Sequence, residues 1–296
     1  MRILVTGASG LLGYEVVKHA LTRGHLIYSV YNTHPINLGQ QLQLDLTVHN
    51  LVAERISEIR PQAIIHAAAH TNVDDCEVNK EHAWKVNTEA TKNLAIISHR
   101  INAQLIYVST DYVFDGEKGL YTEDDRANPI NHYGYTKLMG EYFIKEHAEK
   151  WCIARTSALY GWGHEHKTNF ATWLIDNLKK GGEVKTLTDQ HVSPTLNLNL
   201  ADMLMNIAER EVTGTLHTAG ASRISRYHFA LELAEVFNLN KDLVKKATMK
   251  EMSWKARRPK DSSLDISRTI KILDTKPLQP CEALIKMRDK KLDLDV

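Results

Sequence analysis

The sequence predicts an α/β protein in which a doubly wound, mostly parallel sheet is joined by a smaller C-terminal α/β lobe. Three observations lead to this fold class. Short runs rich in β-branched residues alternate with helical patterns through the first half of the chain. A glycine-rich segment joins the first of these runs to the first helical pattern. The alternation degrades after about residue 162, which indicates that a different unit begins there.

The elements of the first half follow one another in a regular order. A buried strand is expected at 2–7, and the helical pattern over 11–23 ends at Gly24. Further strands are expected at 25–32, 41–46, 63–69, 104–110 and 151–161, and further helices at 51–61, 80–100 and 133–148. Because strands that alternate with helices pair in parallel through right-handed crossovers, these elements predict one Rossmann-like sheet.

The second half is expected to form a lobe that packs directly on the first. A loop at 161–169, helices at 170–180 and near 225–237, a polar break at 257–265 and a final helix at 280–292 are expected. No Gly/Ser-rich or Pro-rich linker separates the two halves. We therefore expect one domain at 1–162 and a smaller lobe at 163–296, with chain crossing back between them.

Composition excludes several classes of partner. The 37 basic and 36 acidic side chains give a net charge of +1, so no basic excess is available to bind nucleic acid. No apolar stretch approaches the ~20 residues of a membrane helix, and no leader pattern is visible at the start. Cys76, Cys152 and Cys281 lack the spacing of a disulfide framework. We expect a cytoplasmic protein, not bound to a membrane.

The glycine-rich segment predicts a dinucleotide site. TGASGLLG places Gly7, Gly10 and Gly13 at GxxGxxG spacing between a strand and a helix. Such glycines allow a tight turn, close approach of the backbone to a pyrophosphate, and close packing of the helix on the strand. The N-terminus of the helix then offers unpaired N–H groups to the anion. We expect 1–162 to be the dinucleotide-binding domain.

The end of the second strand bears on the choice of cofactor. A carboxylate there would bind the adenosine ribose and repel a 2′-phosphate, but the segment from Tyr31 to His34, which includes Asn32, has none. The same segment has no arginine to clamp the phosphate. We therefore expect a modest preference for NADP(H), with NAD(H) also usable.

Two residues on one predicted helix are candidates for proton transfer. Tyr133 and Lys137 are four residues apart, which places them on the same helical face. A tyrosine hydroxyl has a pKa near ~10, and a neighbouring ammonium lowers that pKa by stabilising the phenolate. The spacing alone is weak evidence because it is common. Its weight comes from the strand that ends at Ser109, Thr110 and Asp111, since sheet edges of this kind gather ligand groups.

The two hydroxyl groups at the end of this strand are expected to have different roles. Thr110 can offer a hydrogen bond to a substrate carbonyl beside Tyr133. Ser109 fits capping of a turn as readily as catalysis. No metal site is expected, because His164 and His166 have no carboxylate or cysteine partner at ligand spacing.

Together these segments resemble the extended short-chain dehydrogenases/reductases. They span nearly the whole chain: TGASGLLG, RPQAIIHAAAHTNVDDCE, VNTEAT, STDYVFDG, NHYGYTKLMGE, RTSALYG, DQHVSPT and ARRPKDSSLD. Within that family the chain looks most like the dTDP-4-dehydrorhamnose reductases. The resemblance implies NAD(P)H-dependent reduction of a 4-keto sugar nucleotide, dTDP-4-dehydro-L-rhamnose to dTDP-L-rhamnose, with 163–296 mainly a substrate-binding lobe. It also leaves a homodimer possible.

The resemblance assigns roles by position. It makes Thr110, Tyr133 and Lys137 the catalytic residues. Besides Tyr133 and Lys137, the residues expected at the cofactor are Gly7, Ser9, Gly10, Leu11, Leu12, Asn32, Asp45, Leu46, Ala67, Ala68, Ala69 and Asn87. The residues expected at the substrate are Thr71, Val73, Asp74, Asp111, Tyr112 and Arg258. Arg258 would bind the phosphates of the nucleotide, because a guanidinium donates two parallel hydrogen bonds to such groups.

Two alternatives to this reductase remain open. The chain also resembles the regulatory beta subunit of methionine adenosyltransferase, which implies NADP binding and action through a partner rather than turnover. Another sugar-nucleotide epimerase or dehydratase is the second alternative, although a dehydratase would have two acids beside Thr110 and only Asp111 is present. The reductase pattern commonly has a tryptophan where this chain has Ala158, which leaves the exact sugar and nucleotide base undecided.

Overall fold

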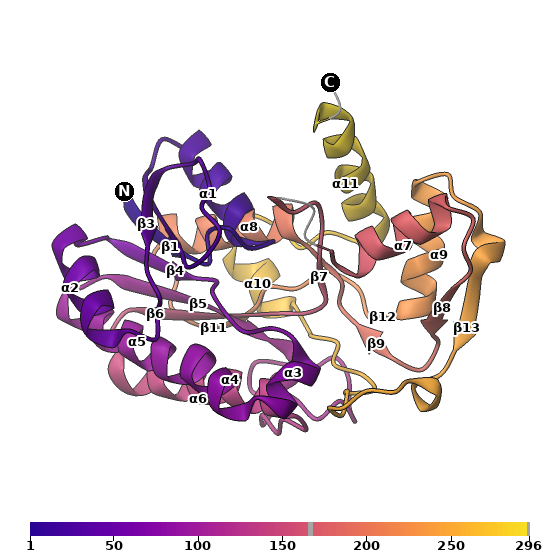
Figure 1. Ribbon diagram of the computed structural model, residues 1–296, viewed down its shortest axis with the longest axis horizontal. Coiled ribbons are helices and arrows are strands. Elements are labelled where there is room, and N and C mark those ends of the chain that lie inside the picture. The colour runs from indigo at the N-terminus through magenta and orange to yellow at the C-terminus, as the bar shows by residue number, and fades with distance from the viewer. Residues whose placement is uncertain (165–167, 295–296) are drawn as a thin grey trace.

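The computed structural model describes residues 1–164 and 168–294. Its centre is a seven-stranded sheet in the order β11-β6-β5-β4-β1-β2-β3, and every pair of neighbouring strands is parallel (Figure 1). The strands are β1 (Arg2–Thr6), β2 (Leu26–Tyr31), β3 (Gln40–Gln43), β4 (Ala63–His66), β5 (Gln104–Thr110), β6 (Trp151–Thr156) and β11 (Gly214–His217). The predicted doubly wound sheet is confirmed.

Helices cover both faces of this sheet (Figure 1). On one face, α2 (His49–Ile59), α5 (Ala90–Arg100) and α6 (His132–His147) pack over β4 and β5. On the other face lie α1 (Gly13–Thr22) and α8 (Asn197–Glu209), and α10 (Ser267–Ile272) lies against β11. Apart from Val108, which is partly buried, the apolar side chains of β1, β4 and β5 are completely buried between these layers. No helix in the described ranges is both long and apolar enough to cross a membrane.

The C-terminal lobe is built from three helices and short strand pairs, to the right in Figure 1. The helices are α7 (Phe170–Lys179), α9 (Arg226–Val236) and α11 (Pro280–Leu294). The pairs are β7 (Leu159–Tyr160) with β10 (Thr195–Leu196), β8 (Val184–Leu187) with β13 (Val244–Ala247), and β9 (His191–Val192) with β12 (Ile224–Ser225). A separate apolar cluster centred on Tyr160 and Phe229 forms the interior of this lobe.

Two predicted elements differ from the structure. The single strand predicted over 151–161 is wrong, because β6 ends at Thr156 and β7 begins at Leu159. Ala158, with a left-handed φ of 42°, breaks the extended run between them. The single helix predicted over 80–100 is α4 (Lys80–Trp84), a π-helical turn η1 (Lys85–Glu89) and α5, and it is preceded by α3 (Val73–Val78), which was not predicted.

The prediction also missed several elements of the second half, including α8 and β11. Ten of the thirteen residues of α8 are buried, so it lacks the wide polar face that identifies an amphipathic helix. The polar segment expected as a break at 257–265 contains no helix or named strand, but it lies inside the protein, because Ser262 and Ser263 are completely buried. The neighbouring Leu264 and Asp261 pair with Tyr121 and His191, which explains why this polar segment lies inside the protein.

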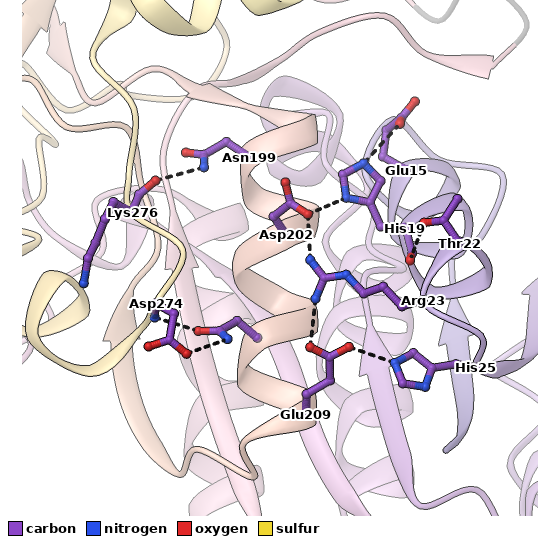
Figure 2. A network of polar contacts seen from close by, with 11 residues as sticks. Glu15, His19, Thr22, Arg23, His25, Asn199, Asp202, Glu209, Asp274 and Lys276 are labelled. Atoms are coloured by element: carbon purple, nitrogen blue, oxygen red, sulfur yellow. Dashed lines mark hydrogen bonds and ion pairs between the residues drawn. The ribbon is translucent and has the colours of Figure 1, made fainter.

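A polar seam joins α8 to α1. Figure 2 shows Asp202 of α8 between His19 of α1 and Arg23, the residue that follows α1, at 2.9 and 2.8 Å. Glu209, near the end of α8, accepts from Arg23 at 2.8 Å and contacts His25 at 2.9 Å (Figure 2). This seam fixes α8 beside the helix that follows the glycine-rich turn.

Candidate active site

The glycine-rich turn is packed too tightly for side chains. Gly7 has a φ of +67°, and a Cβ atom there would lie 2.8 Å from the Cα of Ala68. A Cβ atom on Gly13 would lie 2.1 Å from the carbonyl oxygen of Gly7. Asn197 of α8 donates to the carbonyl of Leu11 at 3.0 Å, and this hydrogen bond ties the turn to α8. The arrangement leaves a backbone cradle of the kind that accepts a pyrophosphate.

Two hollows meet at this turn, and both are lined by Gly10, Ala67 and Ala69. The smaller, of about 230 Å³, is lined at one end by Asn32, Asp45 and Leu46. The residues predicted at the cofactor that line it are Gly7, Ser9, Gly10, Asn32, Asp45, Leu46, Ala67, Ala68 and Ala69. Leu11 and Leu12 line the larger hollow instead.

The larger hollow, of about 480 Å³, contains all three predicted catalytic residues. Thr110 lies at the carboxyl end of β5, and Tyr133 and Lys137 lie one turn apart on α6. The N-cap of α6 is Asn131, whose side chain accepts from the backbone N–H of Gly134 at 2.8 Å. The sequence therefore brings these groups together by starting a helix directly beside the end of a central strand.

Burial acts on Tyr133 and Lys137 in opposite ways. Burial raises the pKa of Tyr133 well above its usual value, so the hydroxyl keeps its proton. Burial lowers the pKa of Lys137 to about 7. The ammonium of Lys137 donates to the carbonyl of Val108 at 2.8 Å and lies 4.0 Å from the centre of the Tyr107 ring. Lys137 can therefore change protonation state near neutral pH, beside a tyrosine that remains an acid.

Thr110 is held by its neighbour Asp111. The Thr110 hydroxyl donates to the Asp111 carboxylate at 3.0 Å and accepts from the backbone N–H of Tyr112 at 3.2 Å. The other carboxylate oxygen of Asp111 accepts from Ser157 at 2.8 Å and from Ser262 at 2.5 Å. Burial raises the pKa of Asp111. The orientation of Thr110 is thus set by a network that reaches across both halves of the chain.

The residues predicted at the substrate divide into two groups. Four of them line the larger hollow: Thr71, Val73, Asp111 and Tyr112. Asp74 and Arg258 do not line it and instead pair with each other, with Arg258 Nη2 3.1 Å from Asp74 Oδ1. Arg258 also donates to the carbonyl of Ala256 at 3.0 Å, so its guanidinium is occupied within the protein. A role of Arg258 in phosphate binding stays a prediction.

Two other residues singled out from the sequence, Asn87 and Ser109, make buried hydrogen bonds to α6. Asn87 is buried, and its amide accepts from the backbone N–H of His70 at 2.7 Å and donates to Thr136 at 3.1 Å. It therefore braces α6 rather than lining either hollow. The hydroxyl of Ser109 donates to Glu141 at 2.6 Å and is buried, although Ser109 also lies at the wall of the larger hollow.

Sequence reasoning missed several residues that line the larger hollow. They are Val108, Thr156, Ala158, Leu159, Thr168, Asn169 and Arg226, of which only Ala158 had been singled out. Most come from the chain beyond residue 157. Contacts between residues far apart in the sequence bring this part of the chain to the edge of the sheet, so no local pattern predicts it. Arg226 begins α9 directly after its N-cap Ser225, but helical periodicity could place it only on that helix.

Metal ligands are absent from the part of the chain that the structure describes: no group of three or more His, Cys, Asp or Glu side chains is placed to hold an ion. His166 lies outside the described residues, and His164 stacks on Tyr14 with ring centres 4.8 Å apart. Thr110, Tyr133 and Lys137 offer proton transfer and hydrogen bonding beside a backbone anion cradle.

Comparisons with known proteins agree with this arrangement. A hypothetical dTDP-4-dehydrorhamnose reductase from Sulfolobus tokodaii is 40% identical, with a TM-score of 0.86 over 94% of this chain and 97% of that one. The dTDP-4-dehydrorhamnose reductase of Bacillus anthracis, crystallised with NADP, is 31% identical, with a TM-score of 0.88 over 98% and 99%. Methionine adenosyltransferase 2 subunit beta of Bos taurus is 32% identical over 90% of this chain and 81% of its own length. Residues 1–291 match the RmlD substrate binding domain family, and the chain belongs to that family.

Proposed function

We propose that this chain is an NADP(H)-preferring oxidoreductase that reduces a 4-keto sugar nucleotide, with dTDP-4-dehydro-L-rhamnose as the leading candidate substrate. One observation carries the proposal: Thr110, Tyr133 and Lys137 line one hollow that begins at the glycine-rich turn. The two dTDP-4-dehydrorhamnose reductase structures named above support the substrate class. In this proposal 1–162 binds the dinucleotide and 163–296 mainly binds the sugar nucleotide.

The residues of the site fit a dinucleotide. The cradle formed by Gly7 and Gly13 accepts a pyrophosphate only because neither position has a Cβ atom. Asn32, Asp45 and Leu46 would hold the adenosine end. No carboxylate lies in the segment from Tyr31 to His34 to repel a 2′-phosphate, which favours NADP(H), and the Bacillus anthracis neighbour was crystallised with NADP. When bound, the dinucleotide supplies the hydride.

The side chains of this chain would move the proton. Tyr133 donates its hydroxyl proton to the keto oxygen as charge develops there, and the raised pKa of Tyr133 ensures that the proton is present. Thr110 hydrogen-bonds the same oxygen by turning its hydroxyl proton from Asp111 to the substrate. Lys137, with a pKa of about 7, returns a proton to Tyr133 and holds the ribose next to the ring that carries the hydride. The result is an alcohol on the sugar and one proton consumed.

A spectrophotometric assay tests this function. Purified protein with NADPH or NADH and a panel of 4-keto sugar nucleotides should show loss of absorbance at the reduced nicotinamide band. Tyr133→Phe should reduce turnover by roughly a hundredfold or more, since general acids contribute on this scale. Its affinity for NADPH should stay unchanged. Turnover that survives this substitution would remove Tyr133 as the proton donor.

A second candidate function follows from the methionine adenosyltransferase relative. That protein is named as subunit beta of the enzyme, and it matches 90% of this chain. In this alternative the chain binds NADP and acts through a synthetase partner. Co-purification with a methionine adenosyltransferase, together with a change in the synthetase rate, would support it. Turnover of a keto sugar without any partner would favour the reductase.

A further inference from the structure

Arg226 projects from the C-terminal lobe into the wall of the hollow that holds the predicted catalytic residues. It is the first residue of α9, and it follows the N-cap Ser225, whose side chain accepts from the backbone N–H of His228 at 3.1 Å. It lines the same hollow as Thr110 and Tyr133. Its side chain is half-buried, because the protein surrounds it except where the hollow opens.

The protein holds one edge of the guanidinium. Nε donates to the side-chain oxygen of Gln190 at 3.4 Å, and the guanidinium lies 4.9 Å from the centre of the Phe170 ring. Gln190 is buried and is itself fixed by a bond to the carbonyl of Pro259 at 3.3 Å. The two Nη groups have no hydrogen-bond partner among the residues that the structure describes.

The charge of Arg226 has no counter-ion within the described part of the chain. Among the residues that the structure describes, no carboxylate forms an ion pair with it, and the carboxylate whose charge acts on it is that of Asp111. The oxygens of Asp111 are already occupied by the hydroxyls of Thr110, Ser157 and Ser262. Burial accordingly lowers the pKa of Arg226.

A comparison within the same molecule makes this unusual. Arg155, a buried arginine of β6, has its charge met by two bonds to Glu141, at 2.9 and 2.7 Å. A desolvated cation is costly when it lacks such a partner. In a wall of a catalytic hollow, that cost indicates a ligand that supplies the missing negative charge.

We propose that Arg226 binds an oxyanion of the substrate, so that the substrate site is built for a molecule with a phosphate or carboxylate group near its sugar ring. The inference rests on the proposed function, because it takes this hollow as the substrate site. The guanidinium fork matches two oxygens of one phosphate or carboxylate, which a lysine cannot do. The oxyanion is either the diphosphate of the nucleotide or a carboxylate on the sugar, as in a uronic acid.

Equilibrium binding to the NADP-loaded protein separates these sources without any turnover. The probes are dTDP and UDP against thymidine and uridine, and UDP-glucuronate against UDP-glucose. Each is titrated by calorimetry into wild type, Arg226→Gln, Arg226→Lys and Arg55→Gln. The last variant removes the same charge from an exposed pair with Glu58 on α2, and it controls for net charge. NADP affinity and the melting temperature report whether each variant is folded.

If the diphosphate is the anion, Arg226→Gln should weaken dTDP and UDP roughly ten- to hundredfold, leave the nucleosides unchanged, and be only partly rescued by Arg226→Lys. If a sugar carboxylate is the anion, wild type should prefer UDP-glucuronate over UDP-glucose, and Arg226→Gln should lose that preference while UDP itself is unaffected. The proposal is overturned if folded Arg226→Gln binds every probe as wild type does, or if wild type favours no anion over its neutral counterpart. Reductase activity that persists in that case would leave the proposed function standing.

Discussion

Glu141 and Arg155 form a two-point ion pair that is almost completely removed from solvent. Arg155 Nε and Nη2 lie 2.9 and 2.7 Å from the two oxygens of Glu141, whose side chain is only 1% exposed. The hydroxyl of Ser109 donates to the same carboxylate at 2.6 Å. Because Glu141 is on α6, Arg155 on β6 and Ser109 on β5, the pair fixes the helix that carries Tyr133 against two strands.

Removing one partner of this pair should destabilise the protein strongly. Glu141→Ala leaves the Arg155 charge buried without a partner, and the expected loss is about 3–5 kcal/mol in the free energy of unfolding. Urea denaturation followed by circular dichroism measures it. The matched control, Glu149→Ala, removes a carboxylate from an exposed contact with His99 and should change stability by less than about 0.5 kcal/mol. Equal losses in the two variants would contradict this role for the buried pair.

The carboxylate of Asp111 should matter for turnover through Thr110 rather than through contact with the cofactor. Asp111→Asn keeps the shape but replaces one acceptor oxygen by an amide donor, so the bonds from Thr110, Ser157 and Ser262 cannot all persist. We expect kcat to fall by about ten- to a hundredfold, with NADPH affinity unchanged. Steady-state kinetics measures kcat, and fluorescence titration measures the affinity for NADPH. Asp124→Asn, at an exposed position, is the control. An unchanged kcat would show that Thr110 does not depend on Asp111.

The pH dependence of the reaction should follow Lys137. Its pKa is lowered to about 7 by burial, so the ammonium is lost as the pH rises through neutrality, while Tyr133 keeps its proton because its pKa is raised. Reduction should therefore slow on the basic side of pH 7. Lys137→Arg cannot lose its charge in this range, so its rate, although lower, should lack that basic limb. If the rate of Lys137→Arg fell at the same pH as that of wild type, the fall would have to come from the titration of another group.

The parts of the site that the sequence predicted are those whose residues lie close together in the chain. The spacing of Gly7, Gly10 and Gly13 and the four-residue step from Tyr133 to Lys137 each lie within one turn or helix, so their placement needs only the element itself. Alternation of strands and helices likewise gave the parallel sheet, because each crossover is a short-range unit.

The parts that sequence did not predict depend on contacts far apart in the chain. Ser262 bonds Asp111 across 151 positions, and Arg226 enters the hollow from a different lobe, so neither has a local signal. Burial of most of its residues hid α8, since periodicity identifies a helix best when one wide face is polar. The left-handed backbone of Ala158 split an apolar run that otherwise resembles one strand.

Acid stability should depend on His66, which lies beneath the site. Its ring contacts the hydroxyls of Thr6 at 2.7 Å and Thr91 at 3.0 Å, and burial, assisted by the charge of Lys137, lowers its pKa from 6.5 to about 3. As the pH falls, His66 therefore takes up a proton in the unfolded chain at a higher pH than in the folded protein. The stability from this residue is complete above pH 6.5 and is lost as the pH falls towards 3.

The expected slope between those limits is ~1.4 kcal/mol per pH unit for this one group. His66→Gln removes the titrating ring while still offering polar atoms to Thr6 and Thr91, so the variant should lose stability at pH 7 but unfold less steeply with acid. Urea unfolding at half-unit steps from pH 7 to pH 4 gives both slopes. His99→Gln, at an exposed ring, should keep the wild-type slope. If the free energy of unfolding had the same slope against pH in wild type and in His66→Gln, the imidazole of His66 would not control acid unfolding. The reason is that glutamine at this position cannot take up a proton on unfolding.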